Sequence, residues 1–250
     1  MPRKRSGLSV LVIAGLAVLG LVAVYFVTDF VLRGYAERRI RQEIQSSVPA
    51  AVSGDINVTI GGISVIQQYL SGNFERIDVE GPSLKVFDEP LSVHVVAQNV
   101  PVDRAKTLGA VHGTVDFTGN TLEALLPPSA MGAQLTFGGD SVTYTGSISV
   151  LGLPIDYQAT ATPSVTADSI ILTPTSAELG TSVGSLDVGG IVRRILGEQP
   201  LRLCVAKYLP EGVELTGVQA QPGHAHLTFE ATGLTLDGDS LSRRGSCSAA

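Results

Sequence analysis

The chain has 250 residues and a formal net charge of −6 at pH 7, with 28 glycines, no tryptophan and 5% aromatic residues. Residues 1–45 hold seven basic and three acidic side chains, a net of +4, which leaves −10 on residues 46–250. An acidic body argues against nucleic acid as a partner and against general adhesion to anionic lipid head groups. About 200 residues suffice for one sizeable core, and their richness in Gly, Thr, Ser and Val favours strands and tight turns over helical bundles.

A long apolar run lies near the N-terminus. Arg3, Lys4 and Arg5 precede Leu8–Val27, twenty residues interrupted by one serine. A helix of twenty residues spans about 30 Å, the thickness of the hydrocarbon core of a membrane. We therefore expect an uncleaved signal anchor. A cleaved secretory signal is the alternative, although the run is longer than the apolar core of such signals and no small-residue cleavage site follows it.

The placement of basic residues favours a cytoplasmic N-terminus and an extracytoplasmic body. Basic residues also follow the apolar run, at Arg33, Arg38, Arg39 and Arg41, so a simple count does not decide the orientation. The basic cluster at the extreme N-terminus does favour a cytoplasmic N-terminus, since long domains such as the body translocate largely regardless of charge.

The segment after the apolar run has the period of an amphipathic helix. Ala36, Ile40 and Ile44 recur every four residues, which predicts a helix that either continues the membrane helix as a rigid stalk or packs its narrow apolar stripe on the body. Its arginines are expected to form a solvated face beside lipid head groups. The chain is accordingly divided into a cytoplasmic basic tail (1–7), a transmembrane signal anchor (8–32), an amphipathic stalk helix (33–48), a β-rich extracytoplasmic domain (49–240) and a polar C-terminal tail (241–250).

Beyond Pro49 apolar and polar residues alternate, which is typical of antiparallel strands with one buried face. The alternating segments are Ile56–Ile60, Ile77–Glu80, Leu91–Val95, Val111–Phe117, Ile155–Ala159 and His224–Phe229. Short helices are expected at Ile63–Leu70, Val102–Leu108, Asn120–Leu126, Leu186–Leu196 and Leu201–Leu209. No low-complexity linker divides the body. The predicted fold class is therefore α+β, one domain dominated by curved antiparallel sheet, with a long N-terminal helix and several short helices.

The two cysteines, Cys204 and Cys247, both lie in the body. In an exported domain an even pair is most simply a disulfide, which here would tie the polar tail back to the domain. Closing a loop of about 40 residues contributes about 4 kcal/mol in the chain-entropy model. The alternative is two unpaired thiols; without a CxxC motif, the sequence does not indicate redox or zinc chemistry.

One motif suggests catalysis. Gly180–Gly184 matches the GxSxG nucleophile elbow, with Ser182 as nucleophile, Asp187 as acid and His224 or His226 as base. That motif requires a parallel α/β scaffold and a helix directly after the serine, neither of which the pattern predicts. The two histidines share one strand face, but the sequence offers no third metal ligand near them. We therefore expect no enzyme activity, no metal and no cofactor.

Four short segments resemble the LmeA-like phospholipid-binding family of actinobacterial cell-envelope proteins. They are Val58–Gly62 with the helix to Gly72, the strand Ile77–Gly81, Gly146–Gly152 and Leu209–Thr216. The resemblance covers roughly residues 35–240. It implies a fold like the tubular lipid-binding domains, in which a strongly bent sheet wraps a long helix around an apolar groove. It also implies an extracytoplasmic protein that binds phospholipid and supports assembly of envelope lipoglycans.

The apolar faces of the predicted strands supply the candidate lipid-binding residues, because a one-faced sheet with few helices must bury that face against core or lipid. They are Val111, Val115, Phe117, Leu135, Phe137, Val142, Tyr144, Leu227 and Phe229. The alternative for each is ordinary core packing. Two functions follow. The first is a membrane-anchored protein that binds phospholipid in support of envelope lipid or lipoglycan assembly, and the second is a non-catalytic structural partner of envelope biosynthetic proteins.

Overall fold

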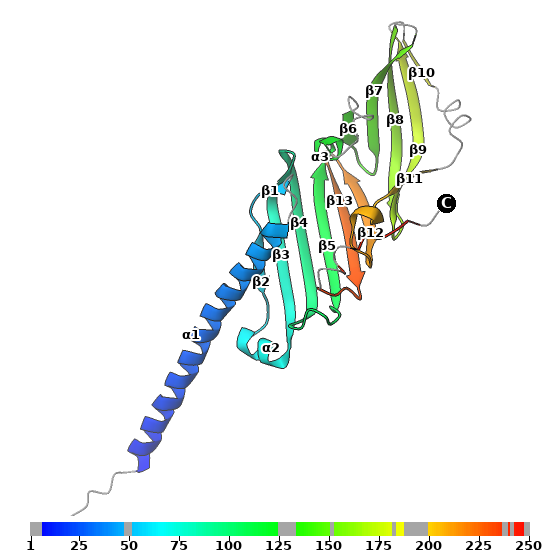
Figure 1. Cartoon of the computed structure of the whole chain (residues 1–250). Helices are drawn as coiled ribbons and strands as arrows, with labels where there is room; N and C mark the ends of the chain where they lie inside the picture. Colours follow the sequence, from blue (N-terminus) through cyan, green and yellow to red (C-terminus); the bar gives the residue numbers. More distant parts are fainter. Residues whose placement is uncertain are drawn as a thin grey trace, which may run out of the picture.

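The computed structural model describes residues 7–47, 52–124, 134–150, 153–181, 184–187, 200–236, 240 and 243–247. A single long helix runs to a body built of two antiparallel sheets, the second of which continues beyond one end of the first (Figure 1). The predicted α+β class, with a long N-terminal helix, antiparallel sheet and short helices, is confirmed.

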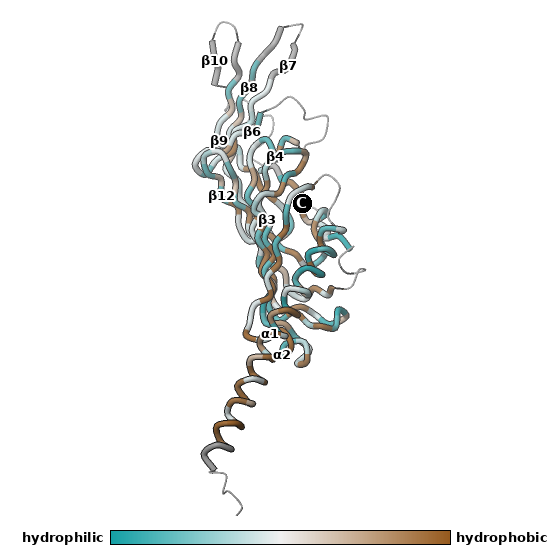
Figure 2. The backbone as a smooth tube through the Cα atoms, turned by 90° about the vertical axis from the view of Figure 1, so that its left-hand side faces the viewer, coloured by the Kyte–Doolittle hydropathy of each residue, from teal (hydrophilic) through white to brown (hydrophobic). Residues whose placement is uncertain are grey.

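Helix α1 (Gly7–Ser47) is unbroken over 41 residues, so the predicted membrane segment and the predicted stalk form one rod. Its first half projects from the body and is apolar (Figure 2). Residues 11–28 are all exposed. Within the described part of the chain, α1 is the one helix long and apolar enough to cross a membrane. Its second half packs on the body through Ile40 and Ile44, so this rod is both stalk and packing element.

The first sheet has the order β1-β3-β4-β5-β13-β12, with β2 also paired to β3. Its strands are β1 (Val52–Ser53), β2 (Asn57–Ile60), β3 (Asn73–Val86), β4 (Glu89–Pro101), β5 (Ala110–Thr118), β12 (Val213–Gln221) and β13 (His224–Thr232). The chain leaves this sheet after β5, builds the second sheet and returns, so that β13 pairs with β5 from Thr118↔His224 to Ala110↔Thr232. The centre of the sheet therefore joins segments more than a hundred residues apart.

The second sheet has the order β10-β9-β8-β7-β6, with β11 paired to β9. Its strands are β6 (Gln134–Phe137), β7 (Val142–Val150), β8 (Leu153–Val165), β9 (Ser169–Thr181), β10 (Gly184–Asp187) and β11 (Leu201–Cys204). Backbone bonds join the sheets, among them Asp140 N–H to the Ala220 carbonyl at 3.0 Å and Gly223 N–H to the Phe137 carbonyl at 3.1 Å. A small core of Phe137, Val142, Ala220 and Ala225 fills this junction.

Two of the predicted short helices are present, with shifted boundaries. Helix α2 (Val65–Ser71) begins at the N-cap Ser64, whose side chain accepts a bond from the Gln67 N–H, and ends at Gly72 with φ 81°. That left-handed conformation is the one in which glycine ends a helix most readily. Helix α3 (Gly119–Ala124) is the second; residues 125 and 126 of the predicted helix lie outside the described residues.

Two other predicted helices are wrong. The segment 102–108 forms turns. The Asp103 carboxylate accepts the Ala105 N–H, and the backbone carbonyl of Asp103 accepts the Lys106 N–H. Such local side-chain bonds favour turns over helix. The segment 201–209 divides into β11 and one 3-10 turn, Ala206–Tyr208, because Leu201–Cys204 pairs along β9. Of Leu186–Leu196, the first two residues belong to β10, and the rest lies outside the described residues.

The predicted disulfide is confirmed. Cys204, at the end of β11, is bonded to Cys247, with 5.9 Å between their Cα atoms and a separation of 43 positions in sequence. The tail is also held by backbone bonds, from the Gly245 N–H to the Leu209 carbonyl and from the Glu211 N–H to the Arg243 carbonyl.

Candidate functional site

The apolar residues of the first sheet lie on one face. On β5, Val111, Val115 and Phe117 point to this face and alternate with polar residues that point to the other. The register places apolar residues of the neighbouring strands beside them, in the rows Leu91–Phe117–Ala225, Val93–Val115–Leu227 and Ala97–Val111–Ala231 across β4, β5 and β13. We call the surface made by these rows, with Val95 and Phe229, the apolar face.

One end of the apolar face is covered. Ile40 and Ile44 of α1 pack there, together with Leu234 and Leu236 from the segment after β13. Val111 is buried in this region. The middle of the face is only partly buried, at Val93, Val95, Val115, Leu227 and Phe229. A band of partly buried apolar side chains therefore lies between the covered end and the junction with the second sheet, and we call it the open band.

The tip of the Phe229 ring occupies the space beside Gly113, its partner on β5. A Cβ atom added at Gly113 would overlap the Phe229 ring. Glycine at this position therefore makes room for the Phe229 ring on the neighbouring strand.

The other candidate residues gather at the junction of the sheets. The rings of Phe117 and Phe137 meet edge to face with 5.7 Å between their centroids, and Leu135 packs beside them. Phe137 and Val142 are buried there, and Tyr144 lies two residue pairs along the same two strands, opposite Leu135. The nine sequence-predicted residues thus form two groups: Val111, Val115, Leu227 and Phe229 on the apolar face, and Phe117, Leu135, Phe137, Val142 and Tyr144 at or beside the junction.

The opposite face of the first sheet is polar and carries histidines paired with carboxylates. His226 Nδ1 lies 2.6 Å from the Asp116 carboxylate, and His112 Nδ1 lies 3.2 Å from that of Glu230. Arg76 donates to both oxygens of Asp78, which lowers the pKa of that carboxyl. This face is therefore a hydrated surface of ion pairs. Within the residues described, no three His, Cys, Asp or Glu side chains are grouped so that they could hold a metal ion.

The GxSxG motif lies in a β-hairpin. Gly180 and Thr181 end β9 and Gly184 begins β10, which pairs antiparallel with β9. Ser182 itself lies outside the described residues. A nucleophile elbow needs a helix after the serine, whereas here a strand follows. His226, one of the two suggested bases, bonds Asp116 on the first sheet.

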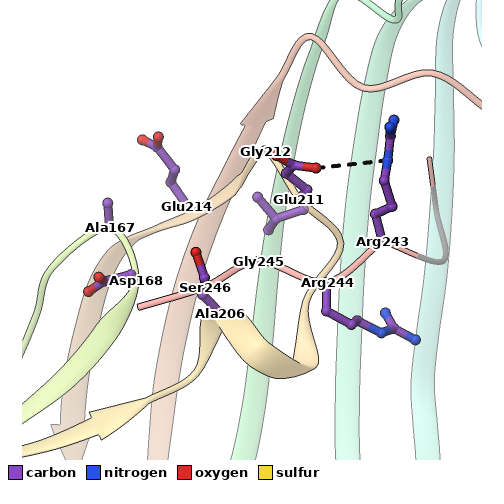
Figure 3. Close-up of a pocket in the computed structure, with 11 residues that line it drawn as sticks. Ala167, Asp168, Ala206, Glu211, Gly212, Glu214, Arg243, Arg244, Gly245 and Ser246 are labelled. Carbon is purple, nitrogen blue, oxygen red and sulfur yellow. Dashed lines mark ion pairs between the residues drawn. The ribbon is translucent and has the colours of Figure 1, made fainter. Parts of the chain in front are cut away.

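A surface cavity of about 410 Å³ lies beside the disulfide-bonded tail (Figure 3). Asp168 and Glu214 lie on one side of it and Arg243 and Arg244 on the other. Arg243 Nε approaches a Glu211 carboxylate oxygen at 3.8 Å. The tail forms one wall, so the shape of this cavity depends on how the tail is held. Its charged lining sets it apart from the apolar face.

A set of polar contacts that no sequence pattern indicated fixes α1 to the body. Asp29 is 3% exposed and accepts bonds from the Ser64 hydroxyl at 2.7 Å and the Ile66 N–H at 2.9 Å. Tyr25 Oη lies 2.7 Å from Ser64 Oγ. Since the Ser64 hydrogen is engaged with Asp29, Tyr25 donates this bond. These contacts join α1 to the first turn of α2.

One turn further along, Arg33 donates to three carbonyl groups of the body. The acceptors are Ile60 at 2.8 Å, Gly62 at 2.8 Å and Ile63 at 3.1 Å. Glu37 accepts the Ile60 N–H at 2.9 Å. Arg33 directly precedes the helical segment whose arginines were expected to form a solvated face, and it instead binds the β2–α2 connection, which presents carbonyls that need donors. The four α1 residues Tyr25, Asp29, Arg33 and Glu37 recur every four positions on one face, and we call them the helix clamp.

The fold and the site define an α+β protein in which a membrane-length helix is fixed beside a sheet with one long apolar face. A family model described as LmeA-like phospholipid-binding matches residues 27–230, which is most of the chain. The protein therefore belongs to the LmeA-like phospholipid-binding family, as its motifs indicated, and this membership supports a phospholipid-binding role. No curated protein and no solved structure gives a significant match. The matched region includes Asp29, Arg33 and Glu37 and ends within β13.

Proposed function

We propose that this protein is a membrane-anchored, extracytoplasmic phospholipid-binding protein that supports assembly of envelope lipids or lipoglycans. The observation that carries the proposal is the open band of the apolar face, next to a helix long enough to span a membrane. The family match gives independent support for phospholipid as the ligand.

The dimensions and energetics of the apolar face suit an acyl chain. A nine-residue strand such as β5 extends about 30 Å, about twice the thickness of one hydrocarbon leaflet. Each methylene removed from water contributes about 0.8 kcal/mol, so covering eight methylenes supplies about 6 kcal/mol. In this proposal Val115, Leu227 and Phe229 contact the chain directly. Phe117, Leu135, Phe137, Val142 and Tyr144 bound the far end of the site, and Val111 anchors the covered end.

The proposed topology follows the segments of the chain. Residues 1–7 are cytoplasmic, 8–32 span the membrane, 33–48 form the stalk, 49–240 form the extracytoplasmic lipid-binding domain and 241–250 form the tail. The Cys204–Cys247 disulfide supports an oxidising compartment for the body. The basic cluster at residues 3–5 supports a cytoplasmic N-terminus.

The test is lipid extraction from the purified full chain followed by mass spectrometry. The full chain is required because α1 contributes Ile40 and Ile44 to the core. We expect co-purified phospholipid in the wild type and a loss of about tenfold in Val115→Gln, because an amide against an acyl chain costs about 1–3 kcal/mol. Thr114→Gln is the matched control, since Thr114 lies next in sequence but on the polar face.

Equal lipid content in the two variants would contradict the assignment of the apolar face. A wild-type chain that carries no lipid and takes up none from vesicles would contradict lipid binding altogether. A stable complex with envelope biosynthetic proteins in that case would favour the structural alternative.

A further inference from the structure

Helix α2 presents apolar side chains to solvent. Ile63 is 83% exposed, Leu70 is 80% exposed and Tyr69 is 61% exposed, whereas the opposite side of the helix buries Val65 and Gln68. At 100° per residue, Ile66, Tyr69 and Leu70 fall within about one third of the helix circumference, and the exposed Ile63 directly precedes the N-cap Ser64. A surface helix of a water-soluble body shows the reverse pattern, with polar residues outward. The outward stripe of α2 is therefore suited to an apolar environment.

The helix clamp places this stripe at the outer end of the apolar run of α1. Ser64, the N-cap of α2, is bonded to both Tyr25 and Asp29. Leu8–Val27 spans about 30 Å as a helix, so Tyr25 lies within about 5 Å of its outer end. Figure 1 shows α2 at the end of the first sheet from which α1 projects. If α1 crosses a membrane, α2 lies at the boundary between acyl chains and head groups.

The exposed apolar surface of α1 continues to the same level. Phe30 is 76% exposed and Val31 is 60% exposed, although both follow the buried Asp29. These side chains lie on the part of α1 that the clamp holds against the body, and they face away from it. Exposed apolar side chains are thus present at this level on both α1 and α2.

The electrostatics of this region are also compatible with insertion. Residues 61–74 contain no charged side chain, in a chain with 16% charged residues. The buried amide of Gln68 is satisfied by the Gly61 carbonyl and the Glu75 N–H. The exposed Tyr69 is of the residue type that concentrates at membrane interfaces, because its ring is apolar and its hydroxyl is polar. Insertion of α2 would therefore require no charge to leave water.

We propose that Phe30, Val31, Ile63, Tyr69 and Leu70 form a membrane-docking collar, which lies in the interfacial layer of the bilayer that α1 crosses. The occupant of this surface is the lipid bilayer, because the helix clamp places the surface at the outer end of the membrane-spanning half of α1. The clamp makes the insertion rigid: α2 cannot leave the interface unless Asp29 and Arg33 release it.

The collar rests on the membrane anchoring of the proposed function, and its consequence for the apolar face rests also on the proposed lipid binding. Strand β3 begins at Asn73, directly after α2, and the Gly72 carbonyl accepts the Val102 N–H at the end of β4. The collar therefore brings the α2 end of the first sheet against the outer leaflet. Val111 is buried near this end, so a lipid from the outer leaflet would reach the open band only past the side chains that cover it, Ile40, Ile44, Leu234 and Leu236.

The absence of tryptophan from the chain allows a direct test. The full chain carrying Leu70→Trp is reconstituted into phosphatidylcholine vesicles whose acyl chains are brominated close to the head group. The matched control is Phe87→Trp, because Phe87 is 59% exposed and lies in the turn between β3 and β4, at the other end of β3. Fourteen residues of strand, about 45 Å, separate the two ends.

We expect the tryptophan emission of the Leu70→Trp variant to shift to shorter wavelength and to be quenched at least threefold more strongly than that of the Phe87→Trp variant. Similar quenching in the two variants, whether strong or weak, would overturn the collar. Ile63→Trp is a second probe of the same surface, expected to behave as Leu70→Trp, and circular dichroism checks the fold of each variant. Lipid extraction from the same samples reports separately on the apolar face, so loss of docking is distinguishable from loss of lipid binding.

Discussion

The two ends of the chain are fastened to the body by different means. Helix α1 is held by the clamp, whose contacts extend over residues 25–37, a rise of about 18 Å. The tail is held within the few residues 243–247, by the Cys204–Cys247 disulfide and by backbone bonds at Arg243 and Gly245. Contacts spread along a rod fix its direction, whereas contacts within a short segment fix mainly its position. In the proposed topology this difference suits an N-terminal element that sets the angle between body and membrane and a C-terminal segment that closes the fold.

The disulfide is expected to have the larger effect on global stability. In the chain-entropy model a closed loop of 43 residues contributes about 4 kcal/mol. The double variant Cys204→Ser/Cys247→Ser should lose roughly that free energy of unfolding in urea titrations followed by circular dichroism. Hydrogen exchange at the Ile60 and Ile66 amides, which bond to α1, should stay unchanged at low urea. A loss below about 1 kcal/mol, or faster exchange at those two amides, would contradict the view that the disulfide and the helix clamp stabilise the protein independently.

Removal of Arg33 tests the other fastening. A hydrogen bond to a charged group contributes about 1.5–3 kcal/mol, and Arg33→Ala removes three that share one guanidinium, so we expect a loss of about 2–3 kcal/mol in docking of α1. Exchange at the Ile60 and Ile66 amides should accelerate by roughly 30- to 100-fold. Arg38→Ala is the control, because Arg38 is exposed on the same helix. Identical exchange in the two variants would mean that the clamp does not hold α1.

The exposed ion pair of Arg76 and Asp78 on the polar face provides a comparison for these two effects. Its removal should change the free energy of unfolding the least. The Arg76 guanidinium lowers the pKa of the Asp78 carboxyl, so this pair stabilises the fold above the ordinary pKa of aspartate, and the contribution disappears as the pH falls through the folded pKa. Because Arg76 is half exposed, solvent screens the pair, and Arg76→Gln should lower the free energy of unfolding near pH 7 by less than either of the other changes. Urea titrations should show that this cost shrinks between about pH 6 and about pH 2. A cost that is constant with pH would show that the ion pair is not its source.

Local sequence patterns predicted the features that depend only on neighbouring residues. The alternation in Val111–Phe117 and His224–Phe229 identified strands β5 and β13 and the face each residue occupies, because strand side chains alternate strictly. The apolar run Leu8–Val27 predicted the projecting half of α1. At 201–209 the pattern failed, since Leu201 and Leu203 fit a strand paired to β9 as well as the predicted helix.

The clamp was not predictable, because each of its bonds joins α1 to a residue 23 to 39 positions away. Asp29 directly after an apolar run has the sequence signature of a membrane boundary, and nothing adjacent to it indicates Ser64 as a partner. For the same reason, no local pattern indicated that the stripe of Ile63 and Leu70 would lie beside the end of the span.

By itself the sequence determined a membrane-length helix, an acidic β-rich body, the two faces of its strands and a family resemblance carried by short motifs. Only the tertiary structure decided that β13 returns to pair with β5, that the middle of the apolar face stays only partly buried and that α1 is fixed at a set angle beside α2. Periodicity records the environment of each residue but not the identity of its distant neighbours. Burial and chain entropy acting on the whole fold select those neighbours.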